Sequence, residues 1–186
     1  MFFEDGVPLA SGWFGYPTMY YLPAVERLDR VQFIRGGSSL LYGPQPGPVV
    51  NMITRTPQPD AEFSARSRHV GGANGLYATY NEISGSIGDV GYSVEIDHRE
   101  FDGERDNADA NVDGASVSLF WRESDVANWR LDLNHYATES GEAGRLPDLF
   151  LHEQPDFVST PFNRIAIERD SIVLGTQREL ADGFTL

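Results

Sequence analysis

The feature that most constrains the fold of this chain is a run of alternating residues near its middle. Val90, Tyr92, Val94, Ile96 and His98 alternate with smaller, polar or charged residues at every second position up to residue 99. A period of two is typical of a β-strand with one apolar face and one polar face. No long segment repeats apolar residues at helical spacing between a cap and a glycine stop, and the best helical candidate, Pro23–Leu28, is one or two turns. We therefore expect a mainly β chain.

The same pattern recurs in five more segments after about residue 61. They are Glu62–Val70, Leu76–Ile87, Asp113–Arg122, Asn128–Ala137 and Ile165–Leu180. From the second strand onward, tight links (GDVG, ESDVA, ADG) alternate with long polar connections. Short turns at one end and long loops at the other are typical of an outer-membrane barrel, in which each strand has an apolar and a polar face. A soluble β-sandwich would explain the alternation equally well, but the loop asymmetry less well.

Composition excludes several kinds of function. The formal charge of −14 argues against a nucleic-acid partner, which requires a basic surface. The absence of cysteine excludes a disulfide framework and a thiolate metal site. Four scattered histidines show no ligand spacing on a shared face, so we expect no protein-held metal. No nucleophile, base or metal constellation is visible, so we expect no enzyme. The first residues, FFEDGVPLA, lack the basic start of a signal peptide, so none is expected in this chain.

A glycine-rich stretch before the first of these strands has a different character. Residues 31–57 read VQFIRGGSSLLYGPQPGPVVNMITRTP, with two apolar segments that predict two buried strands around Val31, Phe33 and Val49–Ile53. A phosphate-binding loop would need a lysine and a hydroxyl after the last glycine. A nucleophile elbow would need glycines two residues on either side of a serine. Neither frame is present.

The residues of this stretch resemble the end of the plug domain in TonB-dependent outer-membrane receptors. The matching segments are Val25–Arg27, Ile34–Gly36, Leu41–Gly43, Val49–Asn51 and Ile53–Pro57, with Glu4–Pro8 similar to an earlier plug strand. In this family a plug fills a barrel of about 22 strands. The resemblance implies that residues 1–58 are the C-terminal part of a plug, and that residues 59–186 are about six strands of a truncated barrel. Such a fragment would lack the rest of the barrel.

The resemblance also implies a function. Residues 36–47 and the segments SGEAGRL and STPFNR are most similar to the ferric citrate type, although Pro48 replaces a usual glycine. The implied function is uptake of a ferric siderophore or ferric citrate across the bacterial outer membrane. Iron would arrive chelated, so no cofactor is expected. The implied partners are the TonB energy-coupling complex, through a missing N-terminal part, the ferric chelate and outer-membrane lipid. The alternatives are a receptor for another nutrient, such as a vitamin or oligosaccharide, and a soluble β-sandwich binding module.

Site residues follow from the same resemblance. Arg35 is expected to anchor the plug to carboxylates of the barrel wall, and Gly36, Gly37, Tyr42, Gly43 and Gly47 to shape the plug turn. The ligand-contact candidates at the plug apex are Trp13, Phe14, Tyr16, Thr18 and Tyr20, and the alternative that these aromatics only pack the plug stays open. The expected lumen-facing charges are Arg66, Arg68, Glu95, Asp97 and Arg99.

Overall fold

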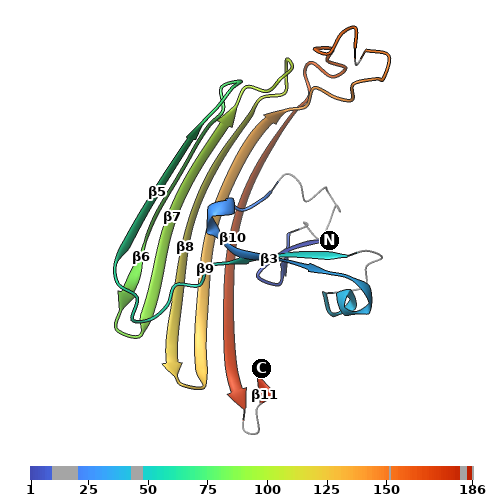
Figure 1. The fold of residues 1–186 in the computed structure, drawn as a ribbon. Helices are drawn as coiled ribbons and strands as arrows, with labels where there is room; N and C mark the ends of the chain where they lie inside the picture. Colours follow the sequence, from blue (N-terminus) through green and yellow to red (C-terminus); the bar gives the residue numbers. More distant parts are fainter. Residues whose placement is uncertain (10–20, 43–47, 151, 181–183, 186) are drawn as a thin grey trace. The chain divides into compact units, whose positions relative to one another are not determined.

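The computed structural model describes the chain except for residues 10–20, 43–47, 151, 181–183 and 186 (Figure 1). The chain divides into two compact units, Met1–Thr56 and Pro57–Leu186. The division falls two residues before the boundary expected after residue 58. Within the described ranges, no helix is long and apolar enough to cross a membrane.

The first unit is a four-stranded mixed sheet with the order β2-β1-β4-β3. Its strands are β1 (Phe2–Glu4), β2 (Val7–Pro8), β3 (Leu28–Ile34) and β4 (Val49–Thr54). β1 runs parallel to β4, which pairs antiparallel with β3. Two 3-10 helices, η2 (Val25–Arg27) and η3 (Gly36–Tyr42), flank β3. The one or two helical turns expected within Pro23–Leu28 are present as the three-residue η2, whereas η3 was not predicted.

Only one of the two strands expected to be buried is buried. Val49 in β4 is 0% exposed, but Val31 and Phe33 in β3 are 56% and 55% exposed. β3 is the last strand in the sheet order, so it has a strand partner on one side only. The expectation of a buried first strand was therefore wrong. An apolar run alone does not distinguish a central strand from an edge strand.

A buried ion pair lies in the first unit. The Tyr21 hydroxyl donates a hydrogen bond of 2.7 Å to Glu4 Oε2, and Arg27 Nη1 lies 3.4 Å from Glu4 Oε1. All three residues are buried. A charge removed from water requires a charged or hydrogen-bonding partner, so Tyr21 and Arg27 stabilise the Glu4 carboxylate.

The second unit is one continuous antiparallel meander. Its strands are β5 (Ser64–Gly71), β6 (Tyr77–Ile87), β7 (Val90–Phe101), β8 (Ala110–Ser124), β9 (Ala127–Gly141) and β10 (Arg164–Leu180). The two-residue β11 (Phe184–Thr185) pairs with the end of β10. Each strand pairs with the next in sequence, as Figure 1 shows. The six expected strands are confirmed, and one sheet in place of two stacked sheets excludes the β-sandwich alternative for the described residues.

The connections are asymmetric, as the sequence indicated. Two-residue turns join β6 to β7 and β8 to β9, and the first contains Gly88 with φ of +58°. A positive φ favours glycine, which has no Cβ to clash with the backbone. Residues 102–109 and 142–163 form the long connections at the opposite end of the strands. The expected ADG link at residues 181–183 lies outside the described residues.

The register of the sheet collects the apolar side chains on one face. Ile83, Val94, Val117, Leu133 and Ile172 stand opposite one another in a single cross-strand row. This apolar face is the open one: Val94 is 37% exposed and Ile172 is 75% exposed. Buried side chains of the opposite face include several polar ones, namely Ser93, Glu95, Ser116, Ser118 and Asp132. The sheet thus exposes apolar residues and covers polar ones, the reverse of a water-facing sheet.

Candidate ligand-contact surface

The covered polar face of β6–β9 is held by hydrogen bonds between neighbouring strands. The Ser116 hydroxyl donates to Glu95 Oε2 at 3.1 Å, and the Ser118 hydroxyl donates to Asp132 Oδ1 at 2.6 Å. Arg130 Nε lies 2.7 Å from Asp132 Oδ2. Such hydrogen bonds and ion pairs hold the charged side chains in one orientation and replace the hydrogen bonds to water that burial removes. This face therefore presents fixed charges of both signs.

The five expected lumen-facing charges all lie on this polar face. Arg66 and Arg68 in β5, and Glu95, Asp97 and Arg99 in β7, point to one side because residues two apart share a face and the register pairs Arg66 with Glu82 and Glu82 with Glu95. Arg66 Nη1 lies 3.7 Å from Glu82 Oε2, and Arg99 Nη2 lies 3.1 Å from Asp97 Oδ2. The structure thus places these five charged side chains on one face of the sheet. That this face lines the lumen of a barrel stays a prediction.

The two long loops are joined to each other by side chains from the first of them. Arg105 donates hydrogen bonds of 3.1 Å to the carbonyl oxygens of Phe157 and Gly144. Asn107 donates at 2.8 Å to the carbonyl oxygens of Thr160 and Asn163. These bonds satisfy backbone carbonyl oxygens of the second loop, and the Asn163 oxygen also accepts a hydrogen bond from the Glu142 N–H group. The loops at this end of the sheet are therefore one connected structure.

Arg164, the first residue of β10, ties the same end of the sheet together. Its Nη1 and Nη2 atoms donate to the two Asp109 carboxylate oxygens at 3.0 and 2.7 Å, and its Nε donates to Glu139 Oε1 at 2.9 Å. A guanidinium group matches a carboxylate in this two-bond geometry. The charged hydrogen bonds from Arg164 lower the pKa of Asp109 below its usual value.

The predicted plug turn is partly described. Gly36 has φ of +74°, which requires glycine, whereas Gly37 does not have a positive φ. Tyr42 packs edge-on against Phe3, with ring centroids 5.1 Å apart. The Arg35 guanidinium is exposed and lies 4.9 Å from the centroid of the Phe33 ring. The predicted anchoring of Arg35 to barrel carboxylates is not tested by this geometry and stays a prediction.

The remaining predicted site residues lie outside the described part of the chain. They are the five apex candidates, Trp13, Phe14, Tyr16, Thr18 and Tyr20, and two glycines of the plug turn, Gly43 and Gly47.

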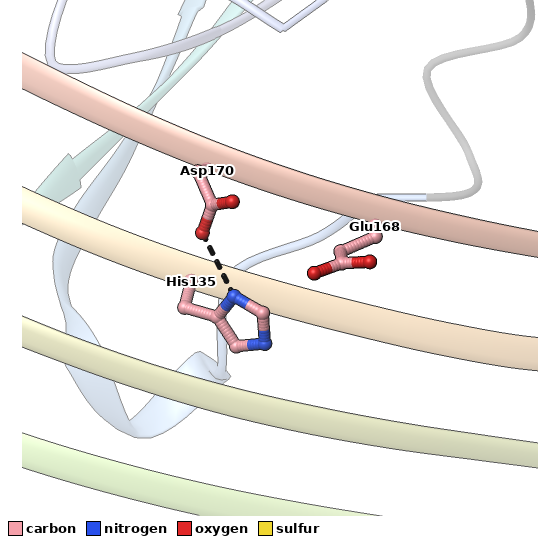
Figure 2. A group of neighbouring side chains, drawn as sticks. All are labelled: His135, Glu168 and Asp170. Atoms are coloured by element: carbon pink, nitrogen blue, oxygen red, sulfur yellow. Dashed lines mark hydrogen bonds and ion pairs between the residues drawn. The ribbon is translucent and has the colours of Figure 1, made fainter.

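One side-chain cluster was not predicted from the sequence. His135 in β9 and Glu168 and Asp170 in β10 offer ligand atoms that all lie within 4.8 Å of one another, on the apolar face of the sheet (Figure 2). Glu168 and Asp170 share a face because they are two residues apart. Their approach to His135 depends on the pairing of Asp170 with His135, which the sequence alone does not reveal.

Comparison with known proteins supports the fold assignment. No protein-family model matches the chain. Among solved structures, the chain is similar to the ferric citrate transporter FecA in its unliganded form (TM-score 0.76, 20% identity). It is also similar to the outer-membrane ferripyoverdine receptor of Pseudomonas aeruginosa (0.73, 17%) and to the ferric-catecholate import receptor Fiu of E. coli K12 (0.74, 17%). Each match covers at least 95% of this chain. The chain has the fold of part of a TonB-dependent receptor.

The receptor fold accounts for both units at once. The match covers both the small mixed sheet and the six-stranded meander. The chain spans 28%, 26% and 30% of the three solved chains. At these identities the likeness shows the fold. The matched proteins are named as a transporter and as receptors, a class that performs no covalent chemistry.

Proposed function

We propose that this chain is part of an outer-membrane receptor for the uptake of ferric chelates, with residues 1–58 contributing to the plug and residues 59–186 to the barrel. The observation that supports this most directly is the inverted sheet, which exposes an apolar row and covers a charged face. In water, an isolated sheet of this kind would expose its apolar face to solvent. In a barrel wall, the apolar face contacts lipid and the polar face lines the lumen.

An aromatic row and a charged row bound the apolar part of this face. Trp121 and Trp129 stand opposite each other near the short turns, and outer-membrane barrels carry such an aromatic girdle at the membrane interface. The first charged row of the face, that of His135 and Asp170, lies six residues from the Trp129 row along β10. Six residues correspond to about 20 Å of strand, or about 15 Å across the membrane at a strand tilt of about 35–45°. The apolar residues between these two rows are the proposed lipid contacts.

The ferric chelate is the proposed cargo because the named functions of the matched structures concern ferric citrate, ferripyoverdine and ferric catecholates. The proposed contacts are the apex residues Trp13, Phe14, Tyr16, Thr18 and Tyr20, with the lumen-facing charges lining the path. Arg35 is proposed to anchor the plug, and the TonB complex to supply the energy for release.

Uptake by whole cells tests the proposal. We expect cells that express the gene for this chain to accumulate radioactive iron from ferric citrate or a ferric siderophore, and a deletion strain to lose that accumulation. A strain that carries the deletion and a restored gene is the control. Loss of vitamin or oligosaccharide uptake in the deletion strain, with iron uptake unchanged, would favour the alternative cargo. Unchanged uptake of all these solutes would reject the receptor role.

A further inference from the structure

The His135 cluster on the open face of the sheet has the composition of a metal site. Imidazole nitrogen and carboxylate oxygen are both ligands of first-row divalent transition metals, and Zn²⁺ takes three such protein ligands in many sites. All three side chains are exposed and come from two adjacent, paired strands, β9 and β10. The sheet backbone therefore holds their Cα atoms at fixed spacing.

The distances in this cluster suit a shared cation. His135 Nδ1 and Asp170 Oδ1 are 2.8 Å apart, and the three ligand atoms lie within 4.8 Å of one another. Zn²⁺ binds nitrogen and oxygen at about 2.0–2.2 Å, so its ligand atoms lie about 3.0–3.5 Å apart. Rotation of the exposed Glu168 side chain closes the remaining gap. The metal takes the place of the proton between His135 and Asp170, and that proton resides on Nε2 in the loaded site.

The charges of the cluster are unbalanced without a cation. Among the residues that the structure describes, the Glu168 carboxylate has no hydrogen-bond or ion-pair partner, although the Asp170 carboxylate lies on the same face two residues away. By contrast, the nearby Asp109 and Glu139 share Arg164. Two neighbouring carboxylates repel each other, and a divalent cation bound between them removes this repulsion.

A second histidine on the same face, His98, has its carboxylate neighbours in a different arrangement. His98 also has two carboxylate neighbours, but Asp113 contacts its Nδ1 at 2.8 Å and Glu100 contacts its Nε2 at 3.7 Å. Since the two carboxylates engage opposite nitrogens of one ring, they cannot share a metal ion with the same nitrogen. In Figure 2, Asp170 contacts one ring nitrogen of His135 and Glu168 lies beside the same ring, and the three ligand atoms lie within 4.8 Å of one another. His98 is therefore a matched control.

We propose that His135, Glu168 and Asp170 form a surface site for a divalent transition-metal ion of the Zn²⁺ class, separate from any chelated iron that the receptor carries. Shallow depressions lined by Glu168 and Glu139 on one side, and by His98 and His135 on the other, leave room for water to complete the coordination. The site does not depend on the identity of the cargo.

Calorimetric titration of the detergent-solubilised protein with ZnCl₂ tests this site. We expect one ion per chain with a micromolar dissociation constant, weakened roughly tenfold or more in each of H135N, E168Q and D170N. H98N and H69N should bind as the unchanged protein does, and far-UV circular dichroism should confirm that every variant is folded. Titration with CoCl₂, whose visible absorption reports ligand type, should give a spectrum that H135N alters.

Three outcomes would overturn the proposal. They are the absence of saturable Zn²⁺ binding in the unchanged protein, equal Zn²⁺ binding by H135N, and a loss caused by H98N but not by H135N. Ca²⁺ binding as tight as that of Zn²⁺, together with no effect of H135N, would show an acidic surface that attracts cations without a site. It would also reject the assignment.

Discussion

Arginine at Ile172 tests whether the exposed row of the sheet contacts lipid. Ile172 lies between the row of Trp129 and the charged row of Asp170, and its side chain is 75% exposed. In a water-facing sheet, an arginine at such an exposed position would change the free energy of unfolding by about 0.5 kcal/mol or less. At the midplane of an outer-membrane barrel, the same change costs about 2–4 kcal/mol. The two environments therefore differ by about a hundredfold in the unfolding equilibrium constant.

The control for Ile172→Arg is Thr176→Arg. Thr176 is exposed on the same face of the same strand and pairs with Trp129. It lies four residues away, about 13 Å along the strand. Near the interface, an added arginine should cost about 0–1 kcal/mol. The expected result is thus a difference of about 1–4 kcal/mol between the two variants.

The measurement is equilibrium unfolding by urea of the protein refolded in phospholipid vesicles, followed by tryptophan fluorescence. The slope with urea should stay the same in both variants, so that the midpoint shift reports stability alone. If both arginines cost less than about 0.5 kcal/mol, or if they cost the same, the exposed row does not face lipid and the reasoning fails.

Three further predictions concern named contacts. Gly36→Ala should destabilise the first unit by about 1–2 kcal/mol because residue 36 has a positive φ, whereas Gly37→Ala should leave its stability nearly unchanged. Denaturant unfolding measures both variants, and equal losses of stability would contradict the role of φ. Tyr21→Phe should cost about 1–3 kcal/mol because it removes the donor from buried Glu4, and an unchanged unfolding midpoint would refute this. The lowered pKa of Asp109 means that its pairing stabilises the loops above the ordinary aspartate pKa, and that this stabilisation is lost as the pH falls through the lower folded value. The protection of the loop amides against hydrogen exchange, measured relative to the intrinsic rate at each pH, should fall there, and Asp109→Asn should remove that pH dependence at a cost of about 0.5 kcal/mol.

Strand periodicity allowed the second unit to be predicted well. All six expected segments are strands, and the alternation at Val90–Arg99 correctly separated the apolar face from the charged face. The reason is physical: a period of two fixes which side chains share a face, whatever the strand pairs with. The ends were less accurate. β8 begins at Ala110 rather than Asp113, because pairing with β7 extends the strand through residues 110–112, where the apolar side chains fall on the opposite face from Ala115 and Val117.

Properties that depend on which strands pair, and in which register, could not be predicted from the sequence. The exposure of β3 follows from its place at the end of the sheet order, which an apolar run does not reveal. The His135 cluster depends on the register between β9 and β10, which brings Glu168 and Asp170 to a single histidine more than 30 residues earlier in the chain. In the same way, the hydrogen bonds that Arg105 and Asn107 form with the other long loop join residues that lie far apart in the chain.

Spin labels on the two faces of β7 test the central claim most directly. The chain contains no cysteine, so single cysteines at Val94 and Glu95 can each be labelled specifically. In lipid vesicles, the label at position 94 should collide readily with dissolved oxygen and poorly with a water-soluble nickel chelate, because it faces lipid. The label at position 95 should show low oxygen accessibility. High nickel accessibility at position 94 would contradict the account, because the apolar face would then lie in water.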